Sequence, residues 1–461
     1  MKEMKWNTLL SIQRFGQESA SSSTPDSRSA FDVDIGRIVF SNAFRRLSRK
    51  TQVHPLAAND HVHTRLTHSL EVAQVGKALG KALGQRIKNQ LPIGVTPDDL
   101  GAIVEAACLA HDLGNPPFGH AGEKAMARWF QANGSRFFED LSAAEQHDLI
   151  SFEGNAQGFR MLTQTENYLF SGGMRLTYAT LGTFMKYPWS SRASNPKFGA
   201  FLTEEPIFDR IAETLGLINK ANHVWARHPL AYLVEAADDI CYAIIDLEDA
   251  VELRILTFEQ VADTLFQAFE TDEIVQIKHS FGTKEAFRVN LARLRGPVFD
   301  KAVSGAIDGF MTAYNEIMHG QFESNIYEQL DESDPRRVLV ASAKLLAKEN
   351  VFPDSKKVEI ELGAYSSFGT LLDAFCRAAI DHTQHLRDPK REPSLEWKSE
   401  LVLKLLGDHA PNEVNAPLAV TWGKYQCLRR VIDYVSGMTD NYALYIAKQL
   451  QEIELSEGQK T

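Results

Sequence analysis

The amino-acid sequence predicts an all-α protein, a helical core followed by additional C-terminal helices, with at most a small β-hairpin. In most segments from Phe31 onward, apolar residues recur at three- and four-residue spacing, which is the period of an amphipathic helix. Strand signals are few, and Lys357 to Leu362 (KVEIEL) alternates as one short strand would. A repeat period of about 20–50 residues, which would signal a solenoid, is absent.

The helical segments follow a short N-terminal stretch. Residues 6–15 are apolar enough to dock as a helix, whereas residues 17–29 are polar and Ser-rich and indicate a mobile linker. Another helix begins after Pro97, with Asp98 and Asp99 in the first turn, where carboxylates favour the helix dipole. The expected helices lie near residues 35–47, 66–79, 98–112, 228–253, 258–270, 284–293, 297–318, 334–349, 367–383, 397–407 and 422–450.

Length and composition are those of an ordinary globular protein. The 461 residues are 44% apolar and 24% charged, and the chain is too long for one simple core. We therefore expect three parts: an N-terminal segment (1–30), a main helical core (31–255) and a C-terminal helical region packed on that core (256–461).

Charge and cysteine usage narrow the functional class. The net charge of −11 argues against general nucleic-acid binding, which needs a cationic surface. The sequence lacks an apolar run of about 18 residues that would span a membrane, and its first eight residues lack a secretory signal core. The four cysteines are widely separated and form no CxxC pair, which predicts buried, reduced thiols and a cytoplasmic protein.

Polar side chains interrupt three apolar helices. His68 lies on one of them, the adjacent pair His111 and Asp112 ends a second, and Asp238 lies in the middle of a third. An adjacent His-Asp pair is weak evidence by itself, because such pairs are common by chance. An unpaired buried carboxylate is costly, however, and a shared divalent cation would provide a partner for all of these side chains.

The residue types restrict the cation. Two imidazoles and two carboxylates, without a thiolate, suit a five- or six-coordinate ion that keeps open water positions. The residues alone leave the choice open between manganese, magnesium, iron, cobalt and nickel, and they argue against a closed structural zinc site. Asp238, Tyr242 and Asp246 lie at i, i+4 and i+8 and therefore share one face of their helix, from which Asp239 points about 100° away.

The segments of sequence around these positions are specific enough to indicate a protein family. The sequence contains, in order between residue 35 and about residue 445, the segments AFRRLSRKTQV, TRLTHSLEV, HDLGNPPFGHAGE, FEGNAQGFR, EAADDICYAIIDLED and SGMTDNYAL. Together they resemble the deoxyguanosine triphosphate triphosphohydrolase family, the dGTPase-like dNTP triphosphohydrolases of the HD superfamily. The resemblance implies an HD-type catalytic core over residues 31–255. It also implies hydrolysis of dGTP, or of several dNTPs, to deoxynucleoside and inorganic tripolyphosphate, with a role in control of dNTP pools.

The resemblance also assigns roles. It implies His68, His111, Asp112 and Asp238 as metal ligands, with Mg²⁺, Mn²⁺ or Co²⁺ favoured and Ni²⁺ or Fe²⁺ as alternatives. It implies His120 and Glu123, three residues apart in FGHAGE, as the catalytic pair, in which Glu123 orients an imidazole that moves a proton. The implied substrate-binding residues are Arg46, Gln52, Arg65, Asn155, Lys186, Tyr187, Lys197, Tyr242 and Asp246.

The sequence also bears on the assembly of the protein and on two alternative functions. The resemblance implies a homo-oligomer, with a hexamer favoured, in which Arg429 or Arg430 reaches a neighbouring subunit's substrate. One alternative is a nucleic-acid-responsive HD regulator, supported only by local basic segments at 45–50 and 390–393. Another is an HD nucleotidase or phosphodiesterase with a different substrate. The blocks FGHAGE, KYP and SGMTD argue against those smaller relatives.

Overall fold

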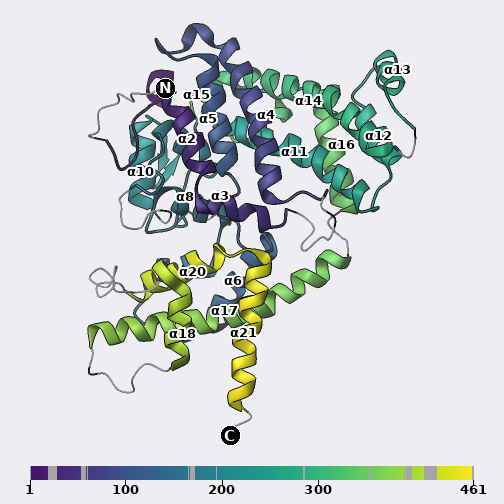
Figure 1. Cartoon of the computed structure of the whole chain (residues 1–461). Coiled ribbons are helices and arrows are strands. Elements are labelled where there is room, and N and C mark those ends of the chain that lie inside the picture. The colour runs from purple at the N-terminus through teal and green to yellow at the C-terminus, as the bar shows by residue number, and fades with distance from the viewer. Residues whose placement is uncertain are drawn as a thin grey trace.

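The computed structural model describes residues 2–18, 28–52, 59, 61–164, 166, 172–193, 195–283, 286–351, 355–388, 390, 397–409 and 423–458. Helices dominate these residues, so the predicted all-α class is confirmed (Figure 1). The predicted small hairpin is present as β1 (Asn219–Ala221) paired antiparallel with β2 (Val224–Trp225). Residues 19–27 of the predicted Ser-rich linker lie outside the described part of the chain.

The described helices have the following bounds. Those up to residue 252 are α1 (Trp6–Leu9), α2 (Ala30–Val39), α3 (Asn42–Arg46), α4 (Arg65–Arg86), α5 (Pro97–Ala110), α6 (His120–Asn133), α7 (Ala143–Ile150), α8 (Gly154–Thr163), α9 (Tyr178–Phe184), α10 (Glu205–Thr214) and α11 (Ala231–Glu252). Those that follow are α12 (Phe258–Phe266), α13 (Thr271–His279), α14 (Phe287–Thr312), α15 (Tyr314–Met318), α16 (Pro335–Asn350), α17 (Ser355–Arg387), α18 (Trp397–Leu406), α20 (Lys424–Ser436) and α21 (Asp440–Gly458). Short 3₁₀ turns connect several of them, at Leu47–Arg49, Lys88–Gln90, Gly134–Arg136, Ile326–Gln329 and Gly407–His409.

Helices α4, α5 and α11 form the centre of the larger, upper part of the molecule (Figure 1). Thr64 and Thr96 begin α4 and α5 with reciprocal capping boxes, which fix where each helix starts. Helices α4 and α5 approach closely at Gly80, where an added Cβ atom would lie 2.6 Å from the carbonyl oxygen of Leu100. Only a residue without a side chain allows this spacing between the two helices.

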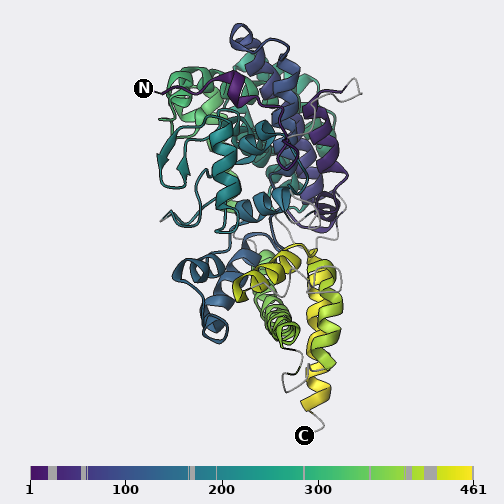
Figure 2. The same cartoon turned by 90° about the vertical axis from the view of Figure 1, so that its left-hand side faces the viewer.

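Two apolar cores divide the described residues. One contains buried side chains between Met4 and Val351, and the other contains side chains of residues 118–156, 198, 201 and 364–450. The second core forms the lower part of Figures 1 and 2, where α6 packs against α17 and the C-terminal helices. The second core thus combines a segment from within the predicted 31–255 part with the residues after 364, and the predicted domain boundary at residue 255 stays a prediction.

Three predicted elements differ from the structure. Lys357 to Leu362 is helical within α17 and not a strand, because six alternating residues fit either period and Lys, Glu and Leu favour helix. The helices predicted at 284–293 and 297–318 are joined in α14, which continues through Pro297 because Leu294 and Val298 are both buried, and residues 314–318 form the separate helix α15. The segment 422–450 forms two helices, α20 and α21, which are separated at residues 437–439.

Two further features agree with the sequence. All four cysteines are buried and none forms a disulfide. Among the residues that the structure describes, none of the helices combines the length and the apolar character needed to cross a lipid bilayer.

Candidate active site

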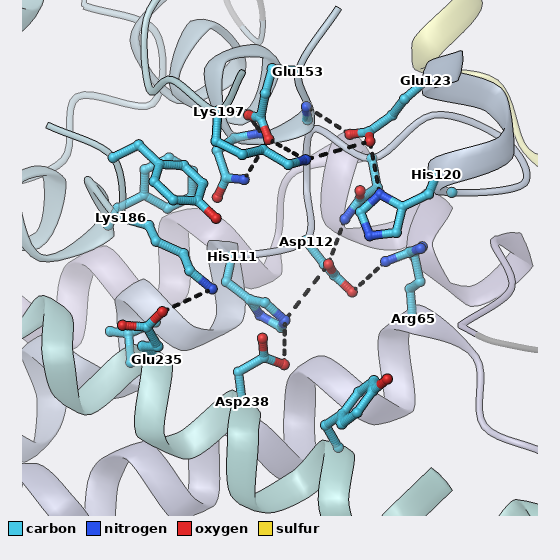
Figure 3. A pocket seen from close by; sticks show the side chains of 18 of the residues that line it. Arg65, His111, Asp112, His120, Glu123, Glu153, Lys186, Lys197, Glu235 and Asp238 are labelled. Atoms are coloured by element: carbon cyan, nitrogen blue, oxygen red, sulfur yellow. Dashed lines mark hydrogen bonds and ion pairs between the residues drawn. The ribbon is translucent and has the colours of Figure 1, made fainter. Parts of the chain in front are cut away.

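His68, His111, Asp112 and Asp238 meet at one point, as the sequence predicts. His68 follows the capped start of α4, His111 caps the C-terminus of α5, and Asp238 comes from α11. The Oδ1 atom of Asp238 lies 3.2 Å from Nε2 of His68 and 3.6 Å from Nε2 of His111. Asp112 Oδ1 lies 3.7 Å from Nε2 of His111, and Figure 3 shows His111, Asp112 and Asp238 pointing toward one another.

This cluster fits a divalent cation. Ligand atoms of His68, His111 and Asp112 all lie within 4.8 Å of one another, and Asp238 Oδ1 approaches both imidazoles. Two nitrogen and two oxygen donors suit a borderline or hard cation and leave open positions for water. Asp239 faces elsewhere, since it pairs with Lys344 at 2.7 Å and accepts a hydrogen bond from Asn325. The two adjacent aspartates thus point to different partners, and the assignment of Asp238 as a ligand stays a prediction.

Neighbouring charges keep the carboxylates of the cluster ionised. Burial raises the pKa of Asp112, but Arg65, whose Nη1 lies 2.8 Å from Oδ2, and the two histidines together outweigh burial and lower it. Burial likewise raises the pKa of Asp238, whereas hydrogen bonding to His68 and the charge of His111 lower it far below its ordinary value. Both aspartates therefore present anionic oxygens, which is the form that binds a cation.

The loop after the His-Asp pair presents His120 at the first position of α6. Gly119 has a φ of 55°, and a Cβ atom there would lie 2.6 Å from Nη2 of Arg65, so only glycine fits. His120 Nδ1 lies 2.8 Å from Oε2 of Glu123, and Glu123 Oε1 accepts a hydrogen bond from the backbone N–H of Gly154. The side chain of His120 is 76% exposed, whereas that of Glu123 is 10% exposed.

In the pair formed by His120 and Glu123, the carboxylate of Glu123 is held in its ionised form. Burial raises the pKa of Glu123, but the hydrogen bond and charge of His120, followed by Lys197, lower it overall. An ionised Glu123 accepts the Nδ1–H of His120 and leaves Nε2 as the ring nitrogen available for proton transfer. The predicted catalytic pair therefore has the geometry of an oriented acid–base group.

Two lysines are held by acidic partners at the rim. Lys197 Nζ lies 3.0 Å from Glu153 Oε1 and 3.9 Å from Glu123 Oε2, and Lys186 Nζ lies 3.6 Å from Glu235 Oε1. Burial lowers the pKa of both lysines, but the adjacent carboxylates outweigh burial and raise it. Both side chains therefore carry positive charge near the His-Asp cluster (Figure 3).

These side chains line one cavity of about 530 Å³. It lies where the two apolar cores meet, because α11 from one core and the start of α6 from the other both contribute to its wall. Apart from His68, which lies beneath it, the predicted ligands and the catalytic pair line this cavity. The predicted substrate-binding residues that also line it are Gln52, Arg65, Asn155, Lys186, Tyr187, Lys197 and Tyr242.

Two predicted substrate-binding residues lie outside the cavity lining. Arg46 lines a different cavity with His409 and Tyr434, and its role near base and sugar stays a prediction. Asp246 lies one turn beyond Tyr242 and is 1% exposed, and its carboxylate oxygens have no hydrogen-bond partner among the described residues. Burial, and then the nearby acids, raise the pKa of Asp246 to about 7.

The two candidate arginines near the C-terminus differ in burial. Arg429 is fully buried, donates from Nη2 to Gln157 Oε1 at 2.9 Å and lies over the ring of Phe201. An arginine enclosed in the core of its own chain cannot reach a neighbouring subunit's substrate. The other predicted candidate, Arg430, is half-buried, and a contact from it to a neighbouring subunit's substrate stays a prediction.

Sequence reasoning missed the acids that hold the lysines. Glu153 accepts hydrogen bonds from Lys197 and from the backbone of Asn155, and Glu235 pairs with both Lys186 and Arg227. The sequence did contain a signal for Glu235, which lies three residues before Asp238 and therefore on the same face of the helix. Glu153 precedes α8 as its N-cap, a position that favours a side-chain acceptor.

Comparison with known proteins agrees with this geometry. Residues 65–153 match the HD domain, and residues 396–449 match the phosphohydrolase-associated domain. A deoxyguanosinetriphosphate triphosphohydrolase-like protein of Pseudomonas aeruginosa is 44% identical over 458 residues, which cover 97% of this chain and 98% of the relative. A protein of the same description from Synechocystis is 37% identical, with 98% and 100% covered. A deoxyguanosinetriphosphate triphosphohydrolase of Salmonella paratyphi A is 33% identical, with 92% and 94% covered.

The helical fold and its His-Asp cluster define a hydrolase of the HD-domain class. The near full-length similarity then places the chain more narrowly, since it extends well beyond the HD domain on both sides. The chain belongs to the deoxyguanosinetriphosphate triphosphohydrolase-like family.

Proposed function

We propose that this protein hydrolyses deoxynucleoside triphosphates, with dGTP favoured, to the deoxynucleoside and inorganic tripolyphosphate. The observation that carries the proposal is one cavity of about 530 Å³ that brings together a His-Asp cluster, three cationic side chains and an oriented imidazole. Its volume lies within the range of roughly 300–1,000 Å³ that is typical of small-molecule sites. The names of the relatives support a nucleoside triphosphate as the occupant.

The charges around the cavity suit a polyphosphate in an otherwise acidic protein. Arg65, Lys186 and Lys197 come from three different segments and surround the His111-Asp112 pair (Figure 3). Fixed cations of this kind stabilise charge on phosphoryl oxygens without reorganising during the reaction. A net charge of −11 makes a local cationic cavity selective for a small anion over a long nucleic acid.

The His-Asp cluster would hold the divalent cation, for which Mg²⁺, Mn²⁺ or Co²⁺ is favoured. Bound there, the cation would act as a Lewis acid on a phosphoryl oxygen. His68, His111, Asp112 and Asp238 present two imidazole nitrogen donors and two ionised oxygen donors for this purpose.

The reaction balances with water as the only co-substrate. The water oxygen forms a bond to the α-phosphorus, and the bond between the α-phosphorus and the 5′-oxygen of the sugar breaks. Tripolyphosphate leaves with the α-phosphoryl group, and the 5′-oxygen takes up a proton. The attacking water releases a proton, and in this proposal His120 moves one of the two protons through Nε2 while Glu123 holds Nδ1.

Product analysis tests the proposal. The purified protein is incubated with each of the four dNTPs and with Mg²⁺, Mn²⁺ or Co²⁺, and the phosphate products are separated by ion chromatography. We expect equal amounts of deoxyguanosine and tripolyphosphate from dGTP, and no turnover after chelation. His111→Ala is the matched variant, because it removes one imidazole of the cluster and should stay inactive with every cation.

The competing functions give different products. Stepwise release of monophosphate from dGTP would indicate a nucleotidase and contradict the proposal. Absence of turnover with every dNTP, with and without single-stranded DNA, would favour a nucleic-acid-responsive regulator. Comparable rates with dATP, dCTP and dTTP would be consistent with the proposed reaction but would show a broad substrate range. A base pocket that hydrogen-bonds guanine would discriminate against the other bases by ~10⁴ or more.

We further propose a homo-oligomer, with a hexamer favoured, that acts in the cytoplasm. The similarity to the family supports the assembly, and buried, reduced cysteines support the compartment. Native mass spectrometry measures the subunit number directly, and a monomer at micromolar concentration would contradict the assembly.

A further inference from the structure

Asp440, the first residue of α21, contacts two segments of the active site. Its carboxylate is 1% exposed. Oδ2 accepts hydrogen bonds from the backbone N–H of Thr51 at 3.0 Å and from Thr51 Oγ1 at 2.6 Å. Oδ1 accepts a hydrogen bond from the backbone N–H of Phe118 at 3.0 Å. One carboxylate thus binds residues that lie more than 300 positions earlier in the chain.

Both partners adjoin residues of the cavity. Thr51 precedes Gln52, and Phe118 is followed by Gly119 and then His120, the proposed proton-transfer group. Phe118 itself has a φ of 59°, a left-handed conformation that a bulky non-glycine residue rarely adopts. Such a conformation costs free energy and persists only where the surrounding structure holds it. Asp440 supplies one of the contacts that hold it.

Two neighbouring contacts reinforce the same connection. The ring of Phe118 packs edge-on against Phe368 of α17, with centroids 6.4 Å apart, inside the second apolar core. Lys50 is 3% exposed and donates from Nζ to the carbonyl oxygens of Asn115 at 2.6 Å and Ser436 at 2.7 Å. The loop at residues 115–119 is therefore fixed between Lys50 and the turn that joins α20 to α21.

We propose that Asp440 is a positioning residue for catalysis, which holds the loop at residues 115–119 so that His120 faces the cavity. The role of His120 rests on the proposed function, whereas the loop contact does not. In this arrangement the C-terminal helices are part of the active-site architecture even though α21 does not line the cavity. A misplacement of about 1 Å by a residue remote from the chemistry can lower a rate by roughly 10²-fold.

The chemistry of the carboxylate makes Asp440→Asn a sharp test. All three bonds that Asp440 accepts come from donors, and an amide has an acceptor at one end only. Whichever way the amide turns, its NH₂ group faces either the N–H of Phe118 or the two donors of Thr51. The side-chain shape is otherwise retained, so the variant replaces at least one accepted hydrogen bond by a contact between two donors and leaves the packing.

Two readouts separate positioning from general destabilisation. Hydrogen–deuterium exchange of a peptide covering residues 113–123 reports the loop directly and needs no activity. Steady-state kinetics with dGTP reports kcat and KM separately. For Asp440→Asn we expect at least tenfold faster exchange at the Phe118 amide, together with a 10- to 100-fold lower kcat and a KM changed less than kcat. Metal content should stay at the wild-type level, because the His-Asp cluster is not altered.

Asn441→Ala is the matched control, since Asn441 is the next residue of α21 and is exposed. It should leave both readouts at the wild-type values. Lys50→Met is a second test that keeps the stem length and removes the donor to Asn115 and Ser436, and it should also speed exchange in the loop. If Asp440→Asn does not fold, Lys50→Met tests the proposal in its place.

The outcomes are distinct. Wild-type exchange at Phe118 in the folded Asp440→Asn variant would overturn the proposal, and so would wild-type kcat with faster exchange. A fall in activity that only follows the folded fraction, with kcat per folded molecule unchanged, would also overturn it. A wild-type protein that hydrolyses no dNTP would instead refute the proposed function, and the exchange measurement would still decide whether Asp440 holds the loop.

Discussion

Glu123 holds His120 from one side only. Its Oε2 atom lies 2.8 Å from His120 Nδ1, and its Oε1 atom is anchored to the backbone N–H of Gly154. The carboxylate is buried and the imidazole is largely exposed, so the pair joins a fixed anion to a group that can reach substrate. We therefore expect His120 to act in proton transfer and the His-Asp cluster to act in metal binding.

Replacing His120 should affect the rate and spare binding. For His120→Ala we expect kcat to fall by roughly 10²–10⁴, the usual range for a positioned general acid or base. Metal content and affinity for dGTP should change little, because the imidazole is not needed to hold either. Glu123→Gln should show a smaller fall, since it only weakens the orientation of the ring. Loss of metal from His120→Ala would show that His120 is a ligand and contradict this assignment.

Replacing Asp238 should have a different kind of effect. Its Oδ1 atom approaches the Nε2 atoms of both His68 and His111, so Asp238→Ala removes a donor shared by the whole cluster. We expect loss of metal occupancy as well as activity, measured by elemental analysis of the purified variant. Asp239→Ala is the control, because Asp239 pairs with Lys344 instead and should keep the metal. Equal metal content in Asp238→Ala and wild type would exclude Asp238 as a ligand.

The fold was largely predictable because helix signals are local. Capping residues such as Thr96 and the apolar period define α5 without reference to the rest of the chain. The errors occur where tertiary packing decides the outcome. Pro297 predicts a helix end, but α14 continues through it because its neighbours are buried. Six residues of alternation at 357–362 were too few to distinguish a strand from the start of a long helix.

The site was predictable where a helix or a short motif sets the spacing. The position of Asp238 beside His68 and His111 follows from helix spacing and the family resemblance, and the contact between His120 and Glu123 needed only the i, i+3 relation. Contacts across the chain could not be predicted in this way. The separation of Arg46 from the cavity and the bond between Asp440 and Phe118 depend on how the two cores meet.

A histidine outside the cavity makes stability depend on pH. His63 Nδ1 lies 2.7 Å from Asp249 Oδ1, and Nε2 lies 3.3 Å from Glu71 Oε1. Burial lowers the pKa of His63, but the two carboxylates outweigh burial and raise it from 6.5 to about 10. A raised pKa stabilises the folded state fully below pH 6.5, and this contribution is lost as the pH rises toward 10.

The variant His63→Gln isolates this effect. Glutamine cannot be protonated, so the variant should melt at a lower temperature than wild type near pH 6, and the difference should shrink toward pH 10. Thermal unfolding followed by circular dichroism across that range measures it. A difference that stays constant with pH would show that His63 contributes through packing and not through its charge.

Glycine at position 119 should be essential for the arrangement of Arg65. A Cβ atom at Gly119 would lie 2.6 Å from Nη2 of Arg65, and the positive φ disfavours a side chain as well. Gly119→Ala should therefore displace the guanidinium from Asp112 and lower kcat/KM for dGTP by at least tenfold. Gly94→Ala controls for strain alone, since Gly94 also has a positive φ but has open space around it. Equal kcat/KM in the two variants would contradict the prediction.

Hydrolysis of dGTP in water enriched in oxygen-18 tests the central claim most directly, because it reports both the product and the atom attacked. Mass spectrometry of the two products after complete turnover should find one oxygen-18 atom in tripolyphosphate and none in deoxyguanosine. That result means that water attacks the α-phosphorus and that the bond to the 5′-oxygen breaks. Label in deoxyguanosine, or label in monophosphate without tripolyphosphate, would contradict the account.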